Sequence, residues 1–382
     1  MIQSFQCPTT IHLGLGAHER IGDILSTLAS DNLFICVDAA VRGSEIMARI
    51  ETALRGRSTT YGAFSEIEPD PSDTTVERAF AQCSGQGATA ILALGGGSTI
   101  DVAKAVGILM TNGGRIHDYE GIEKYKVPPL PLVAIPTTAG TGSEVSGSCV
   151  ITDTRRHLKM SIRHASLNPA RFAILDPIAL RTMPAHVAMH SGMDAFVHAF
   201  ESYVARGASP LTDALNLHAI ELIAGSIRAF VADRSDAQAG LAMLCGSALA
   251  GMAFGQTGLG NVHCLARFVG AYFHLSHGLS NAVCLPHVAA FNRPAAVRRY
   301  ARLAPLLGGG LAGTEEEASH ETVRLIRELC RDLDVPAQLR DVGGRAELFG
   351  EMADLCLEAG YNRWNPRETT RQDFLELLES AF

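Results

Sequence analysis

The stretch ATAILALGGGSTID, residues 88–101, decides the fold of this 382-residue chain. The apolar run Ala88–Leu94 predicts a buried strand, and a helical pattern covers about Ser98–Met110. The glycines at Gly95–Gly97 permit close approach of a ligand, and the helix N-terminus offers free N–H groups. The stretch therefore predicts a phosphate or pyrophosphate site; the alternative is a tight turn in which Ser98 only caps the helix. It is not a P-loop, because no Gly-Lys-Ser/Thr follows.

Strand-like and helical runs alternate around this stretch. Further strands are predicted at Asn32–Asp38 and Leu130–Ile135. This alternation favours a mostly parallel sheet with helices on both faces, in which ligands bind at the carboxyl ends of the strands. The helical patterns between the strands are Ala17–Ser30, Ser44–Leu54 and Thr74–Ser84.

The pattern changes near Pro184, after which strand-like runs vanish. Long helical patterns follow at Ala185–Arg206, Pro210–Asp233 and Ala237–Phe254. The chain is longer than a single core usually allows, so two domains are expected. We predict an α/β domain over residues 1–182 and an all-α domain over residues 183–382.

Composition excludes several classes of protein. The net charge of −8 and the lack of a Lys/Arg cluster disfavour a nucleic-acid partner. Nine cysteines without a CxxC pair favour a reducing compartment, and the N-terminus lacks the charged and apolar regions of a signal peptide. The longest uncharged run, Gly240–Ala266, is rich in glycine and contains His263. It indicates a buried helix followed by a loop rather than a membrane span. A cytoplasmic protein is expected.

Two more polar features follow predicted strands. The loop Pro136–Ser146 carries three threonines and two glycines, which suit contacts with a ribose or a base; the alternative is an ordinary Ser/Thr-rich turn. Asp38 ends the first strand. There it can accept hydrogen bonds from a ribose 2′-OH and repel a 2′-phosphate, or it can serve only as a turn or capping residue.

Four side chains in the helical half form a candidate metal site. Asp194 and His198 are four residues apart and share one helix face. His263 and His277 lie fourteen residues apart in a glycine-rich, weakly charged region. One oxygen and three nitrogen donors suit a divalent first-row ion such as Fe, Zn, Co or Ni. The alternative is that buried histidines satisfy one another in a core.

The segments GGGSTID, PTTAGTGSEVS, GMDAFVHAFESYVA and HGLSNAVCLPHV together resemble the iron-containing (group III) alcohol dehydrogenase family. The length of the chain and its pattern of strands and helices are most similar to those of the lactaldehyde reductase and propanediol dehydrogenase branch. The resemblance covers essentially the whole chain. It implies an N-terminal dinucleotide-binding domain, a helical metal domain and an active site in the cleft between them. The implied activity is NAD- and Fe²⁺-dependent (Zn²⁺ as an alternative) oxidation of a small alcohol or reduction of an aldehyde. Relatives are often homodimers or larger homo-oligomers.

The resemblance also implies roles for particular residues. The metal ligands would be Asp194, His198, His263 and His277. Lys159 matches a lysine placed near the nicotinamide, unless it is only a solvated strand lysine. The implied cofactor-binding residues are Asp38, Asp70, Gly95, Gly96, Gly97, Ser98, Asp101, Thr137, Thr138, Thr141, Ser143 and Lys159.

Arg267 departs from the pattern of this family. Members of this branch usually carry a histidine four residues after the ligand that matches His263, beside the substrate, where it assists proton transfer. Arginine cannot act as a base near neutral pH, so that role is lost or moves to His274 or water. Arg267 then either binds an anionic group of the substrate or pairs with an acid such as Glu201. The catalytic candidates are Arg267, His274 and Lys159.

Three alternative functions share this kind of sequence. One is a metal-independent reductase of the same fold, resembling maleylacetate reductase, in which the ligand positions are usually altered. Another is a fold relative such as glycerol dehydrogenase or dehydroquinate synthase. The third is a non-catalytic NAD-binding relative.

Overall fold

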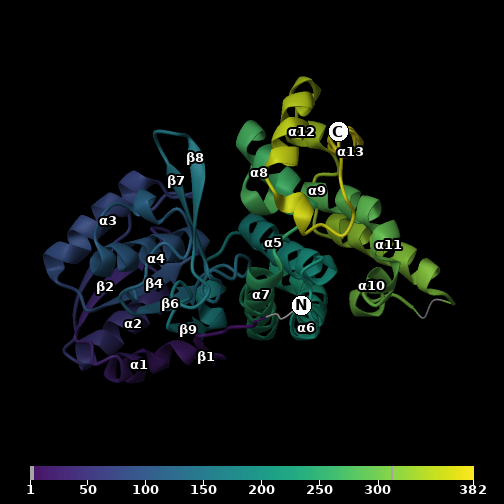
Figure 1. Cartoon of the computed structure of the whole chain (residues 1–382). Coiled ribbons are helices and arrows are strands. Elements are labelled where there is room, and N and C mark those ends of the chain that lie inside the picture. The colour runs from purple at the N-terminus through teal and green to yellow at the C-terminus, as the bar shows by residue number, and fades with distance from the viewer. Residues whose placement is uncertain (1–3, 311–312) are drawn as a thin grey trace. The chain divides into compact units, whose positions relative to one another are not determined.

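A six-stranded parallel sheet lies at the centre of the N-terminal half of the computed structural model, which describes residues 4–310 and 313–382 (Figure 1). Each adjacent strand pair in it is parallel. The strand order is β1 (Thr10–Leu13), β9 (Phe172–Leu175), β6 (Leu132–Pro136), β4 (Ala90–Gly95), β2 (Asn32–Val37) and β3 (Thr60–Phe64).

Apolar side chains on both faces explain why the four inner strands, β9, β6, β4 and β2, are buried. In β2, Leu33, Ile35 and Val37 face one core, while Phe34 and Cys36 face the other. Helices α1 (Ile21–Thr27) and α2 (Glu45–Gly56) cover the first face, and α3 (Asp73–Gln86) and α4 (Gly97–Asn112) cover the second. Continuous apolar strands are typical of a parallel sheet covered on both sides. The predicted α/β fold is confirmed.

The strand order reverses between β2 and β4. The chain passes from β2 to β3 on one side and then returns to place β4 on the other side of β2. A crevice at such a switch point, outside the carboxyl ends of the strands, is where ligands bind in open α/β sheets. Asp38 and Gly96 follow β2 and β4 at this edge.

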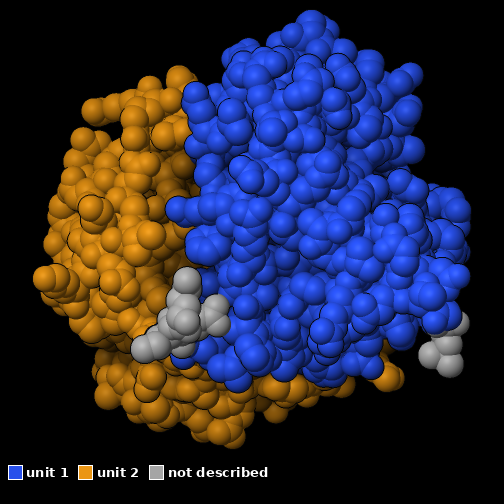
Figure 2. Space-filling model, turned by 45° about the vertical axis from the view of Figure 1, so that its right-hand side comes forward, with its two compact units in different colours: residues 1–5, 185–233, 245–382 blue, residues 6–184, 234–244 orange. Residues whose placement is uncertain are grey.

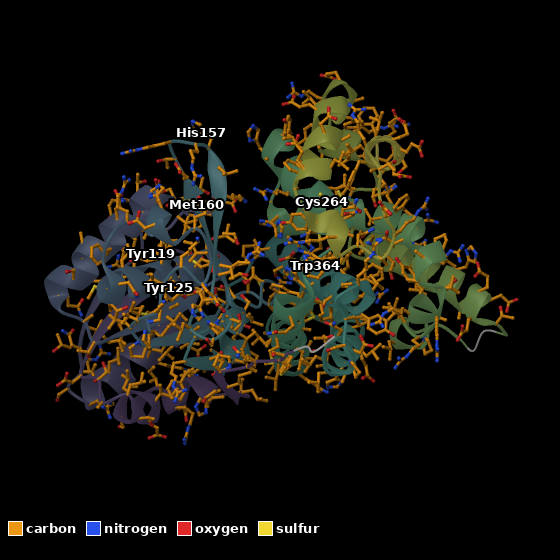
Figure 3. All side chains as sticks on the ribbon, viewed as in Figure 1. Tyr119, Tyr125, His157, Met160, Cys264 and Trp364 are labelled. Carbon is orange, nitrogen blue, oxygen red and sulfur yellow. The ribbon has the colours of Figure 1, made fainter. Side chains whose placement is uncertain are left out.

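A second sheet of three strands was not predicted. It consists of β5 (Gly121–Ile122), β8 (Leu158–Arg163) and β7 (Ser148–Asp153), and the β7–β8 pair is an antiparallel hairpin. Its strands alternate buried and partly exposed residues and carry charges, so they lack the apolar runs of the main sheet. His157 lies at the end of this hairpin (Figure 3).

The C-terminal half is helical, as predicted. Helix α5 (Ala185–Val204) packs against α6 (Pro210–Ala232) and α9 (His277–Asn292), and α8 (Asn261–Phe273) packs against α9 and α12 (Phe349–Glu358). From Gly192 to Val204, α5 is buried on all sides. The other helices are α7 (Ala237–Thr257), α10 (Val297–Ala301), α11 (Glu315–Asp332) and α13 (Arg371–Ser380).

The chain folds into two compact units (Figure 2). One contains Gln6–Pro184 with Arg234–Leu244, and the other contains Ala185–Asp233 with Cys245–Phe382. The first part of α7 therefore belongs with the sheet unit, although the sequence pattern groups it with the helices.

Two helices, α6 and α7, are long and apolar enough to cross a membrane by length and composition alone. In α6, Ile220, Ile223, Ile227 and Phe230 are buried at helical spacing, which is typical of a core helix. Helix α7 ends at Thr257 and α8 begins at Asn261, so the predicted loop is short and the end of the uncharged run is helical.

Candidate active site

Asp194, His198, His263 and His277 converge in the helical unit. Their potential ligand atoms all lie within 4.8 Å of one another. The Oδ1 atom of Asp194 is 3.5 Å from Nε2 of His277 and 3.7 Å from Nε2 of His263. The Oδ2 atom of Asp194 is 3.9 Å from Nδ1 of His198, whose ring stacks on His263 with centroids 4.6 Å apart. The structure thus brings together the four side chains that the sequence singled out.

Three helices supply these side chains. Asp194 and His198 come from successive turns of α5, His263 from the first turn of α8, and His277 from the first residue of α9. The first three are buried, whereas the His277 side chain is 44% exposed. The group is therefore enclosed except beside His277.

Gly278 allows α9 to begin close to α5. A Cβ atom at this position would lie 2.1 Å from the carbonyl oxygen of His190 on α5. The hydroxyl of Ser276, the N-cap residue of α9, also lies 2.9 Å from Nδ1 of His190. These two contacts fix the start of α9 and thereby place His277 beside Asp194.

Glu201 orients His263 from one further turn along α5. Its buried carboxylate accepts hydrogen bonds from the backbone N–H of Val262 at 2.6 Å and from Nδ1 of His263 at 2.7 Å. The proton is therefore held on Nδ1, and Nε2 faces Asp194. Such partners of metal-binding histidines fix the ring and its tautomer. The alternative that Glu201 pairs with Arg267 is wrong, because Glu201 bonds the N-terminus of α8 instead.

The protonation states of these side chains suit a binding site for a cation. Burial would raise the pKa of the Asp194 carboxyl, but the imidazoles of His198 and His277 hold this pKa well below its usual range. Burial would lower the pKa of His263, but Asp194 and Glu201 raise it to about 9. Asp194 thus stays ionised, and a proton held on the imidazoles is what a metal ion would displace.

The contacts of Asn281 indicate whether a metal ion fits among these side chains. Its Nδ2 donates to Oδ1 of Asp194 at 2.8 Å and lies 3.2 and 3.3 Å from Nε2 of His277 and His263. Its Oδ1 is buried without a hydrogen-bond partner in the described residues. The potential metal-ligating atoms of Asp194, His263 and His277 thus already surround a positively polarised N–H group, the amide of Asn281. One carboxylate with three imidazoles suits Fe²⁺ or Zn²⁺. The residues present fit the metal that the family resemblance implies.

The two cofactor motifs pack against each other in the sheet unit. A Cβ atom on Gly96 would lie 3.2 Å from Oγ1 of Thr138, and one on Gly97 would lie 2.7 Å from Cγ2 of Thr141. Thr137 donates its backbone N–H to the carbonyl of Gly95 at 3.1 Å. The glycines are therefore required for the two loops to meet at the strand ends.

The start of α4 remains available to a phosphate. Its N-cap is Gly96, and no side chain caps the helix. Ser98 is the second residue of the helix, so the alternative that Ser98 caps it is wrong. Free N–H groups at a helix N-terminus, next to glycines, fit the pyrophosphate of a dinucleotide.

Asp38 lies directly after β2, on the strand next to β4. One carboxylate oxygen accepts the backbone N–H of Ala40 at 2.9 Å, which is the turn role considered for this residue. The other oxygen has no hydrogen bond within residues 4–310 and 313–382, so it can still accept one from a ribose hydroxyl.

Asp101 and Ser143 are hydrogen-bonded to each other. The carboxylate of Asp101 accepts the Ser143 hydroxyl at 2.6 Å and the N–H of Val150 at 2.9 Å. The buried ammonium of Lys104 donates to the carbonyls of Ser146 at 3.0 Å and Ser148 at 2.7 Å. Through these contacts, Asp101 and Ser143 help to hold the segment around residues 146–150 in place. The role of Lys104 was not predicted, although Lys104 stands one turn after Asp101.

Four other predicted residues lie in less enclosed places. Lys159 and Asp70 form an exposed ion pair with an N–O distance of 2.6 Å, which contributes little to stability. His274 is an exposed residue in the left-handed conformation, with φ of 56°, at the end of α8. Arg267 is partly buried on α8, one turn after His263.

A second group with metal-ligating side chains has a structural explanation. His117 lies 3.0 Å from Asp73 and 3.5 Å from Asp153. The carboxylate oxygens of these acids already accept backbone N–H groups, and Asp153 is paired with Arg156. The cluster ties the β7–β8 hairpin to α3.

Fold and site define a class, the oxidoreductases that combine a nucleotide-binding parallel sheet with a helical metal domain. Comparison with protein families agrees: "Iron-containing alcohol dehydrogenase" matches residues 8–177, and "Fe-containing alcohol dehydrogenase family, C-terminal" matches residues 188–382. The chain belongs to the iron-containing alcohol dehydrogenase family. It is an oxidoreductase of the alcohol dehydrogenase type.

Relatives cover the whole chain. It is 35% identical to an NAD-dependent methanol dehydrogenase from Bacillus methanolicus over 99% of both chains. It is 34% identical to lactaldehyde reductase from Escherichia coli over 98% of both. A crystal structure of 1,3-propanediol oxidoreductase superposes with a TM-score of 0.97 at 34% identity and covers 100% of both chains. The resemblance seen in the sequence is confirmed.

Proposed function

We propose that this protein is an NAD(H)-dependent, iron-dependent alcohol dehydrogenase or aldehyde reductase for small alcohols and aldehydes, with zinc as the alternative metal. The observation that carries the proposal is the convergence of Asp194, His198, His263 and His277 with ligand atoms within 4.8 Å. Relatives named for methanol, 1,3-propanediol and lactaldehyde support a small substrate. The described free cysteines are mostly buried, which suits a cytoplasmic protein, and we expect a homodimer or larger homo-oligomer.

Different residues of the chain would bind the metal ion, the cofactor and the substrate. Asp194 and the three histidines hold the ion, and Glu201 fixes the tautomer of His263. When bound, the ion supplies a Lewis acid that lowers the pKa of an alcohol and polarises a carbonyl. The N–H groups at the start of α4 orient the pyrophosphate, and the free oxygen of Asp38 accepts a ribose hydroxyl. Arg267 cannot accept the alcohol proton, so that proton leaves through water or His274.

A metal-independent reductase of the same fold is less well supported. It would not need four convergent donors, nor a buried glutamate that orients one of them. The four metal-ligating side chains, together with glycine loops that let a cofactor approach closely, argue against a non-catalytic relative.

The choice of cofactor tests the proposal at Asp38. With Fe²⁺-loaded protein and short aldehydes, kcat/KM for NADH should exceed that for NADPH by roughly 10-fold or more, about 1.4 kcal/mol. Asp38→Gly should reduce this preference, because it removes the carboxylate that repels a 2′-phosphate. The matched control is Asp31→Gly, which removes the same charge from an exposed position at the opposite end of β2. A wild-type preference for NADPH, or no aldehyde-dependent oxidation of NADH, would contradict the proposal.

A further inference from the structure

We propose that Arg267 binds an anionic group of the substrate, so that the preferred substrates are short aldehydes whose far end carries a carboxylate or another oxyanion. This inference rests on the proposed function for the type of reaction. It adds the substrate class, which neither the metal ligands nor the cofactor loops determine.

The position of Arg267 follows from α8. His263 and Arg267 are four residues apart in this helix and therefore share a face, with a rise of roughly 6 Å between them. Side chains on a helix lean toward its N-terminus, and for Arg267 this is the direction of His263. The Arg267 side chain therefore leaves α8 on the face that carries His263, about one turn further along the helix, a spacing that suits a short bifunctional molecule.

Arg267 has no counter-ion. Within the described part of the chain it makes no hydrogen bond and no ion pair, and its guanidinium contacts only the ring of Phe268, 5.8 Å from the centroid. Some other arginines of the helical unit are paired, such as Arg293 with Glu316 and Arg371 with Asp354. A partly buried guanidinium that is always charged, with five unused donors, is suited to bind an oxyanion in two-pronged geometry.

The acids around α8 are already engaged. Glu201 accepts the N–H groups of Val262 and His263 together with Nδ1 of His263. Glu351 on α12 accepts the hydroxyl of Tyr272 at 2.7 Å. Neither acid neutralises Arg267, so a carboxylate from outside the protein is the complement that the site lacks.

The charges allow two anchoring points for one substrate. A divalent ion among one carboxylate and three neutral imidazoles carries a net charge near +1, which suits the oxygen of an aldehyde or alcohol. Arg267 adds a second, separate positive charge. A substrate with a carbonyl at one end and an oxyanion at the other would match both, whereas a neutral aldehyde would leave the guanidinium bound only to water.

The test compares 4-oxobutanoate, 3-oxopropane-1-sulfonate and butanal with NADH and Fe²⁺-loaded protein. The wild type should favour both anions over butanal. Arg267→Ala should lower the ratio of kcat/KM for anion to butanal by roughly 10- to 100-fold, and Arg267→Lys should lower it less. Arg298→Ala, which removes a charge from a side chain that is 85% exposed, should leave the ratio within about 2-fold of the wild type.

A binding readout separates recognition from turnover. Calorimetric titration of the NAD⁺-loaded, metal-free protein with 4-hydroxybutanoate should give measurable affinity that Arg267→Ala removes, and 1-butanol should bind more weakly. Equal anion-to-butanal ratios in the wild type and in both Arg267 variants would overturn the inference, as would a wild type that prefers butanal. Failure of every aldehyde to oxidise NADH would instead contradict the proposed function.

Discussion

Glu201 shows how a residue that binds no metal can determine a metal site. It lies on the same face of α5 as Asp194 and His198, and it holds Nδ1 of His263 while Nε2 points to Asp194. The four proposed ligands could be named from the sequence: helical spacing pointed to Asp194 and His198, and residue type together with the family resemblance pointed to His263 and His277. The role of Glu201 was missed, although its position seven residues after Asp194 was a usable signal. Asn281 was also missed, although it follows His277 by four residues on α9; its other partners, Asp194 and His263, come from α5 and α8.

Replacement of Glu201 tests this role directly. Glu201→Gln keeps the shape but removes the charge and leaves too few acceptors for the three N–H groups. We expect the dissociation constant for Fe²⁺ to rise roughly 10- to 100-fold. Metal titration of the stripped protein measures it, and Glu351→Gln, which alters a contact to Tyr272 of α8, is the control. An unchanged dissociation constant in Glu201→Gln would show that the carboxylate only caps α8.

At the scale of elements, the strands that were predicted are all buried on both faces, although β9, which is equally buried but only four residues long, was missed. β2, β4 and β6 are continuous apolar runs, and each was placed within two residues at either end. β7 and β8 were missed because a hairpin with one face partly exposed carries charged residues. Helix α9 illustrates a different case: His277 stood out in the sequence, but only the structure shows that Gly278 is required by the contact with His190.

Gly278→Ala should therefore damage the metal site without touching a ligand. The added methyl group would lie 2.1 Å from a backbone oxygen of α5, so α9 must shift and carry His277 with it. We expect a loss of Fe²⁺ affinity of roughly 10-fold or more, and a lower melting temperature from a destabilisation of about 1–3 kcal/mol. Gly225→Ala is the control, because a Cβ atom at this position in α6 meets nothing within 4 Å. Normal affinity in Gly278→Ala would mean that the start of α9 is not fixed by this contact.

At the scale of the whole molecule, the two units carry separate parts of the proposed site. The sheet unit holds the glycine and threonine loops, and the helical unit holds the proposed metal ligands. The alternation of strands and helices predicted this organisation. It could not predict that Arg234–Leu244 belongs with the sheet unit, because long-range packing rather than local periodicity decides that.

Metal content measured together with activity tests the central claim most directly. Protein stripped with a chelator should be inactive with NADH and a short aldehyde, and stepwise addition of Fe²⁺ under anaerobic conditions should restore activity to a plateau at about one ion per chain. Asp194→Ala, which removes the carboxylate at the centre of the group, should neither bind the ion tightly nor recover. Full activity of the metal-free protein, or unchanged metal binding by Asp194→Ala, would contradict the assignment of Asp194, His198, His263 and His277 as the catalytic metal site.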